Sequence, residues 1–194
     1  QKDKISFTFA AFSFFSAVWM FATFMMFLNK DHIEAAAFWD RVVYAGVVFI
    51  PTVMFHFGLA LTRQKIIKGK IILIIGYVIS TTFLFLIPSD LFVSGVFDYK
   101  WGVHTKAQLF HHIFLVYFFF YVIAWFVIVF QYYRSKKISL IEKERVKYCF
   151  IAFVTLASFG SLGFLPAYGV GIYPFSYLSG LVFVVIISYA IVRH

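Results

Sequence analysis

Three histidines are the residues with the clearest potential for chemistry in this chain of 194 residues. His56 lies in the middle of an apolar stretch, whereas His111 and His112 stand at the start of a later one. An imidazole inside an apolar helix can bind a ligand, relay protons or ligate haem. The alternative for His56 is a hydrogen bond that joins two neighbouring helices, and the sequence leaves both interpretations open.

The depths of these histidines argue against a metal. At about 1.5 Å per residue, His56 lies about 20 Å into its helix and His111 about 5 Å into its own. Two histidines that ligate the same haem must lie at the same depth in the membrane. The short histidine boxes of di-iron oxidases are absent, and the single cysteine, Cys149, excludes a disulfide within the chain and a thiolate cluster. We therefore expect no cofactor and no metal, and interpret His111 and His112 as an interfacial pair.

The elements that must position these residues are membrane helices. Hydrophobic residues make up 63% of the chain and charged residues 13%, whereas a soluble domain is under half apolar. A bilayer core needs about 20 apolar residues per helix, and six stretches qualify. They are Ile5–Leu28, Val42–Thr62, Ile71–Ile87, Gln108–Phe130, Val146–Leu165 and Ile172–Val192. The prediction is an all-α polytopic bundle that forms one domain over residues 1–194.

Basic residues give this bundle an orientation. With both ends in the cytoplasm, the outer segments hold only Lys30, Arg41, Lys100 and Lys106, and the other thirteen of the 17 lysines and arginines lie inside. The positive-inside rule favours this arrangement. The net charge of +9 is therefore explained by topology, and we expect membrane lipid as a partner and no nucleic acid.

Local signals refine the helix borders. Ser139 and Glu142 have the spacing of a capping box, which predicts a helix start on the cytoplasmic side. Pro88 ends the third helix, and residues 88–106 are expected to form the longest outer loop, with aromatic residues suited to the membrane interface. Pro51 lies inside the second predicted helix, where it should cause a kink that either shapes a cavity or serves packing alone.

The motifs of common enzymes are missing. The sequence has no phosphate-binding loop, no acid pair within the apolar stretches and no nucleophile beside a base. We therefore predict that the chain is not an enzyme. A small transporter or channel is one alternative function, although His56 and a few hydroxyls would be its only polar path. A haem- or metal-binding membrane protein is the other, and the histidine depths disfavour it.

A set of motifs resembles the N-terminal seven-helix sensor region of bacterial histidine kinases and diguanylate cyclases. The run from Phe38 to Gly46 contains a Trp-x-Arg-x-x-Tyr-x-Gly pattern, which Pro51 and His56-Phe57 follow. Leu165-Pro166 comes later, and the chain closes on Ser188–His194 with a Tyr-Ala-Ile-x-Arg pattern. The resemblance covers essentially the whole chain.

This resemblance implies a receptor. The family has seven helices, and we count six in this sequence. This difference suggests that Gln1–Leu28 corresponds to the second helix of the family, so the first would precede this chain. The resemblance also implies the bacterial plasma membrane, a homodimer through the last helix, and a cytoplasmic kinase or cyclase beyond it. A small or lipidic signal would bind at the positions that match the family. These are Trp39, Arg41, Tyr44, Pro51 and His56. Arg41 would pair with Asp40 or Glu34, or hold an anionic signal.

Overall fold

The computed structural model describes residues 2–63, 67–136, 138–173 and 175–193. Lys65 and Lys137, which entered the charge count, and the terminal Gln1 and His194 lie outside the described residues. The described elements are α1 (Lys2–Leu28), α2 (Ile33–Val47), α3 (Ile50–Leu61), α4 (Ile67–Leu86), β1 (Val93–Tyr99), β2 (Gly102–Ala107), α5 (Leu109–Tyr133), α6 (Leu140–Ser161), the 3₁₀ helix η1 (Leu162–Tyr168) and α7 (Ser176–Arg193).

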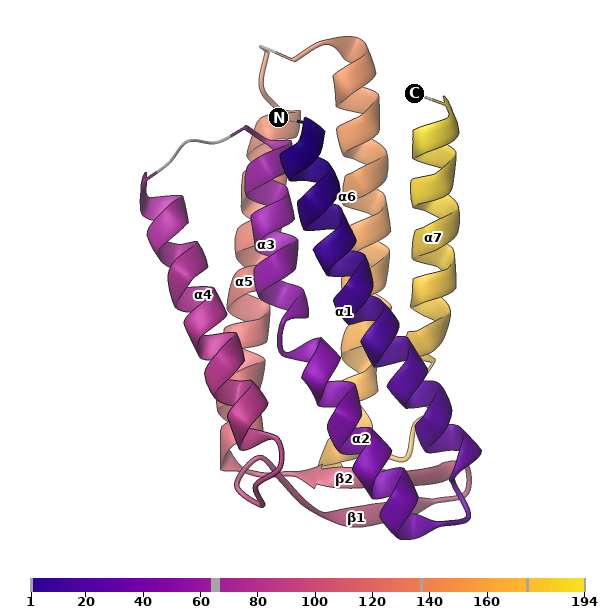
Figure 1. Ribbon diagram of the computed structural model, residues 1–194. Coiled ribbons are helices and arrows are strands. Elements are labelled where there is room, and N and C mark those ends of the chain that lie inside the picture. The colour runs from indigo at the N-terminus through magenta and orange to yellow at the C-terminus, as the bar shows by residue number, and fades with distance from the viewer. Residues whose placement is uncertain (1, 64–66, 137, 174, 194) are drawn as a thin grey trace.

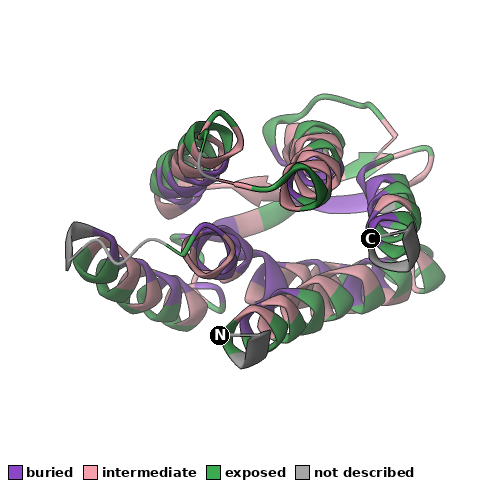
Figure 2. Ribbon diagram, turned by 90° about the horizontal axis from the view of Figure 1, so that it is seen from above, coloured by how far each residue is buried: buried purple, intermediate pink, exposed green. Residues whose placement is uncertain are grey.

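The helices run side by side in an elongated bundle, and the two strands cross one end of it (Figure 1). Both termini lie at the other end, together with the α3–α4 and α5–α6 connections. Seen along its length, the bundle turns its buried faces inward and its exposed faces outward (Figure 2). The polar connections and the termini therefore gather at the two ends of one apolar body.

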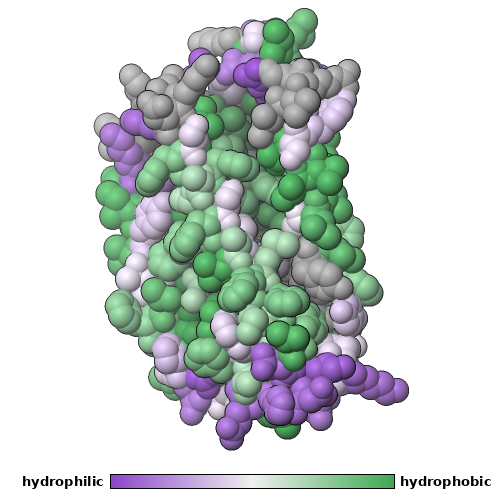
Figure 3. All heavy atoms as spheres, turned by 45° about the vertical axis from the view of Figure 1, so that its right-hand side comes forward, coloured by the Kyte–Doolittle hydropathy of each residue, from purple (hydrophilic) through white to green (hydrophobic). Residues whose placement is uncertain are grey.

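The outer surface of that body is apolar. Large hydrophobic side chains such as Phe14, Phe85 and Val116 are more than 60% exposed, and a wide hydrophobic band separates two hydrophilic ends (Figure 3). Soluble monomers rarely expose apolar patches of more than a few hundred Å². Within the described residues, five helices are long and apolar enough to cross a membrane, and Leu178–Ala190 in α7 is a shorter apolar segment. The protein is therefore a helical bundle that crosses the membrane several times.

The second predicted span is broken rather than merely bent. It begins at Ile33, nine residues before the predicted start, and is interrupted between α2 and α3. Pro51 occupies the first turn of α3, where a missing N–H costs little. At the break, the Tyr117 hydroxyl from α5 lies 3.2 Å from the Val48 carbonyl oxygen. The prediction of a kink within a continuous helix was wrong, because the chain restarts its helix at the proline.

The predicted outer loop contains a β-hairpin, so the all-α assignment needs correction. Strands β1 and β2 pair antiparallel from Val93 opposite Ala107 to Tyr99 opposite Gly102. Val93, Val96, Val103 and Thr105 supply β-branched side chains, and β1 also holds the aromatic residues Phe97 and Tyr99. This composition favours strands, but the segment is much shorter than the apolar helices that dominate the sequence pattern. The two strands pair with each other throughout, apart from an irregularity between Val93 and Val96.

The predicted capping signal at α6 is half confirmed. The Ser139 hydroxyl accepts a hydrogen bond from the Glu142 backbone N–H at 3.2 Å. The Glu142 carboxylate serves another purpose: it accepts from the Tyr132 hydroxyl at 2.6 Å and lies 3.3 Å from the Arg63 guanidinium. This cluster joins the ends of α3, α5 and α6 where the termini lie.

Candidate functional site

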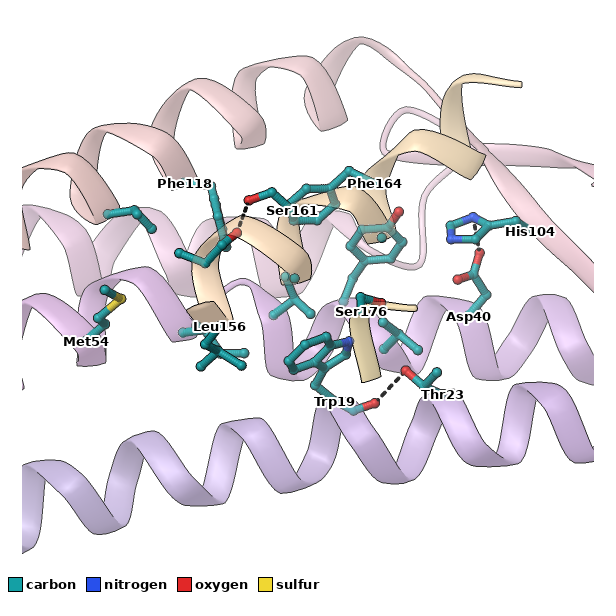
Figure 4. A pocket seen from close by; sticks show the side chains of 18 of the residues that line it. Trp19, Thr23, Asp40, Met54, His104, Phe118, Leu156, Ser161, Phe164 and Ser176 are labelled. Atoms are coloured by element: carbon teal, nitrogen blue, oxygen red, sulfur yellow. Dashed lines mark hydrogen bonds and ion pairs between the residues drawn. The ribbon is translucent and has the colours of Figure 1, made fainter. Parts of the chain in front are cut away.

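A narrow cavity lies inside the bundle, between α1, the broken α2–α3 span, α5 and the junction of α6 with η1. Its volume is about 70 Å³. Successive positions on one face of the broken span line it, which are Asp40, Val43, Tyr44, Val47, Ile50 and Met54. Asp40 and His104 lie at one end and Met54 lies at the other (Figure 4). The break after Val47 and the 3₁₀ geometry of η1 both border this space, which is where a membrane protein tolerates irregular backbone.

Asp40 is the charged residue of the cavity, and it is only 1% exposed. Its Oδ2 accepts from the Thr105 backbone N–H at 2.7 Å and from the Thr105 hydroxyl, and lies 3.2 Å from His104 Nδ1. Its Oδ1 is buried without a hydrogen-bond partner. A buried polar atom without a partner is costly. One carboxylate oxygen therefore fixes the hairpin to α2, and the other is available to accept a hydrogen bond.

Tyr44 belongs to a chain of hydroxyl and imidazole groups beside Asp40. Its hydroxyl lies 3.0 Å from Nε2 of His111, whose Nδ1 lies 3.0 Å from the Tyr168 hydroxyl. His112 Nδ1 is 2.8 Å from the same hydroxyl. The chain joins α2, α5 and η1 at the hairpin end of the cavity. It satisfies His111 within the protein, in keeping with a structural role for the two adjacent histidines.

Among the residues described, no cluster of three or more His, Cys, Asp or Glu side chains could hold a metal ion. Its charged and imidazole side chains, Asp40 and His104, lie together at one end, and the rest of its lining offers hydroxyl groups such as those of Thr23, Ser161 and Ser176. These arrangements favour neither the haem alternative nor the transporter alternative.

Of the five positions predicted for the site, only Tyr44 lines the cavity. Trp39 packs in a small cluster with Met26, Ala36 and Val103. Pro51 is buried at the start of α3. His56 Nδ1 lies 3.0 Å from the Tyr77 hydroxyl of α4, which is the interhelical hydrogen bond that was one of its two interpretations.

Arg41 has a different partner from the two predicted. Its guanidinium pairs with Asp90 at 3.0 Å and donates to the carbonyl oxygens of Pro88 and Val93. Asp40 was not available to it, because successive helical residues point to different sides and the Asp40 side chain turns inward to Thr105. Arg41 therefore anchors the start of the hairpin through three hydrogen bonds.

Asp40 and His104 are the site residues that sequence reasoning missed. Asp40 is four residues before Tyr44, so the two share one helix face, and this spacing was a usable signal. His104 had no such signal, because it reaches the cavity through a hairpin that was predicted as a loop.

The hairpin is also tied to η1. Partial burial of the Tyr99 phenol raises its pKa above the ordinary value, so this group stays a neutral donor. It donates to the Pro166 carbonyl oxygen at 2.7 Å. The end of the cavity that holds Asp40 is thus closed by a strand pair with fixed contacts on both sides.

Comparison with known proteins gives one match. The family model described as the N-terminal 7TM region of histidine kinase matches residues 2–194. Neither a curated protein nor a solved structure matches the chain. The match extends over nearly the whole chain and agrees with the apolar helices described above. The chain therefore belongs to the family of N-terminal 7TM regions of histidine kinases, whose role is that of a non-catalytic membrane sensor.

Proposed function

We propose that this sensor region detects a small or lipidic signal in the cavity around Asp40 and Tyr44, and passes the signal through α7 to a cytoplasmic output domain, a histidine kinase or a diguanylate cyclase. The observation that carries this proposal is the position of Ser176. This residue lies in the first turn of the last helix and also lines the cavity. A molecule in the cavity would thus touch the helix that leads toward the output domain.

The contact between η1 and α7 is tight enough to transmit a change. A Cβ atom added at Gly163 would lie 2.8 Å from the Ser176 hydroxyl oxygen and 3.1 Å from its Cβ. A shift of η1 toward α7 must therefore move α7 rather than be absorbed by empty space. Signalling also needs two packings of similar free energy and a ligand that prefers one of them.

We expect that a bulky side chain at Gly163 mimics this displacement. In the full-length receptor, Gly163→Leu should change the output activity without ligand by about fivefold or more, the lower range of allosteric coupling. Val116→Leu is the control, because Val116 is 74% exposed on α5, outside the proposed relay and the proposed dimer stripe. Output activity in membranes is the readout. Equal output from Gly163→Leu and the unaltered receptor, with both correctly folded, would contradict the relay.

The hairpin end is proposed to face outward across the bacterial plasma membrane. Four basic residues lie toward the hairpin end, which are Lys30, Arg41, Lys100 and Lys106. More lie at or near the helix ends beside the termini, among them Lys4, Arg63, Lys70, Arg134, Lys136, Lys143 and Arg145. The excess of cations beside the termini supports a cytoplasmic location for that end.

Cysteine accessibility tests this orientation. In a Cys149→Ser background, Lys100→Cys should react with an impermeant maleimide added to whole cells, and Lys136→Cys should react only after lysis. The reverse pattern would overturn the orientation.

A homodimer through α7 is a further part of the proposal. Leu181, Val184 and Val185 are each more than 55% exposed on this helix, and their spacing forms one stripe. Two such stripes can pack against each other. Disulfide cross-linking of Val185→Cys in the Cys149→Ser background should yield a covalent dimer, and a persistent monomer would count against it.

A further inference from the structure

The shape of the cavity restricts its occupant. Asp40 and Met54 are fourteen positions apart on the α2–α3 span, so the lined face is about 20 Å long at 1.5 Å per residue. The volume of about 70 Å³ is below that of the engineered cavity of roughly 150 Å³ that holds benzene. A space this small holds neither a compact ring nor a long chain unless the lining helices move apart, and the elongated lining then suits a slender chain.

The wall of the cavity away from Asp40 is apolar. Met54, Phe118, Val122, Phe153 and Leu156 surround that part. The hydroxyls that line the rest are engaged: Thr23 donates to the Trp19 carbonyl oxygen at 2.9 Å, and Ser161 donates to the Ala157 carbonyl oxygen at 2.6 Å. This part of the cavity suits a hydrocarbon tail.

The opposite end offers one unused acceptor. Asp40 Oδ1 has no partner, although Oδ2 of the same carboxylate takes both donors of Thr105. The nearby Arg41 cannot compensate it, because its guanidinium is held by Asp90. A carboxylate oxygen accepts hydrogen bonds and attracts positive charge. A protonated amine supplies both an N–H donor and a positive charge.

A second space, on the lipid side of the bundle, adjoins this cavity. A hollow of about 700 Å³ lies between α1 and α7 beside the hairpin, and Thr23 lines both spaces. Its wall includes Phe24, Phe27 and Leu181, with Lys30 and Trp101 near the hairpin end. The two spaces are neighbours at Thr23, so a chain that entered from the bilayer would have to displace this side chain.

We propose that the cavity binds a linear cationic amphiphile, with its ammonium group on Asp40 Oδ1 and its unbranched tail directed toward Met54. The inference rests on the proposed function, because it assigns a ligand class to the same sensory cavity. It predicts selectivity for head group and for chain length, and each can be measured as binding without any output domain.

The first experiment compares head groups on one tail. Radiolabelled dodecylamine, dodecanol and dodecanoate are each titrated into the chain in nanodiscs of neutral phosphatidylcholine, and empty nanodiscs give the background of lipid partition. Dodecylamine should bind in saturable fashion, with dodecanol weaker and dodecanoate unbound. Saturable dodecanol binding that equals the amine would overturn the ammonium assignment, and so would saturable dodecanoate binding.

Asp40→Asn tests the contact itself. The amide oxygen can still accept from Thr105, which preserves the hairpin anchor, while the amide nitrogen replaces the acceptor that faces the ligand. Dodecylamine affinity should fall by about 10- to 100-fold, the range for a hydrogen bond to a charged group. Asp98→Asn is the matched control, because Asp98 is exposed on β1, and it should bind as the unaltered chain does. Undiminished affinity in folded Asp40→Asn would overturn the proposal.

A second variant tests the tail. Val122→Phe should shorten the apolar part of the cavity, so hexadecylamine and dodecylamine should weaken at least tenfold while octylamine keeps its affinity. Val116→Phe is the control, because Val116 is 74% exposed on the same α5 helix. Equal affinities of Val122→Phe and the unaltered chain for all three amines would contradict the tail position.

The outcomes separate this inference from the proposed function. If no amine binds but Gly163→Leu alters output, the relay stands and the ligand class is wrong. If amines bind through Asp40 while Gly163→Leu leaves output unchanged, the ligand class stands and the relay is wrong.

Discussion

Replacing Gly46 with alanine should lower the free energy of unfolding by about 3 kcal/mol, the upper part of the usual range for overpacking. A Cβ at this position would lie 2.6 Å from the Phe15 carbonyl oxygen and 2.8 Å from the Trp19 backbone nitrogen. Both atoms belong to the backbone of α1, so no side-chain rotation can relieve the contact. The two helices must separate, although alanine favours the helix itself by about 1 kcal/mol over glycine.

Unfolding by sodium dodecyl sulfate in mixed micelles, followed by tryptophan fluorescence, measures this effect. Gly160→Ala is the matched control, because its added Cβ would be 3.7 Å from the nearest atom, the ring of Trp19. That variant should stay within about 0.5 kcal/mol of the original protein, as substitutions without a specific conflict usually do. If Gly46→Ala proves as stable as Gly160→Ala, the close approach of α1 and α2 is wrong.

The second large effect is expected at Tyr117. Its hydroxyl is within hydrogen-bond distance of the Thr52 hydroxyl, lies 2.6 Å from the Ser80 hydroxyl and donates to the Val48 carbonyl oxygen at the helix break. Tyr117→Phe removes one group that serves three buried oxygens on α2, α3 and α4. Each buried polar group left without a partner costs about 1–3 kcal/mol, whereas interhelical bonds in membranes average about 0.6 kcal/mol. We expect a loss of about 2 kcal/mol.

The same unfolding titration tests this prediction. Thr82→Ala is the control, because the Thr82 hydroxyl bonds only to its own helix at the Val78 carbonyl oxygen and is exposed. Its substitution should change stability by less than about 0.5 kcal/mol. A Tyr117→Phe protein with full stability would show that the oxygens at the break find other partners, and that the break does not depend on α5.

Length and hydropathy were sufficient to predict the bundle, because a membrane span requires a long apolar stretch. They did not predict the break after Val47, since both halves are apolar and the proline sits at the start of a helix rather than in its middle. They also missed the hairpin, whose strands satisfy their backbone groups by pairing with each other. That pairing depends on the approach of Val93 and Ala107, which local composition does not specify.

The candidate cavity was only partly predictable for a related reason. Tyr44 could be found because it lies within a recognisable motif. Asp40 appeared to be a surface partner of Arg41, because an acid and a base stood side by side in sequence. In the folded chain these neighbours point to different sides: Asp40 reaches β2 at Thr105 and Arg41 reaches Asp90 before β1. Only the spatial arrangement separates the two roles.

The hairpin contacts have a consequence for how such receptors diverge. Asp40 joins the hairpin to α2, and Tyr99 joins it to η1 at Pro166. The hairpin therefore holds two walls of the cavity at a fixed separation. Its length sets how far apart those walls stand. A residue inserted or deleted near the turn, in a surface segment where such changes are tolerated, would widen or narrow the cavity with every lining side chain unchanged. On the proposed orientation and function, ligand choice is thus retuned from outside the membrane, through the hairpin rather than through the residues that line the cavity.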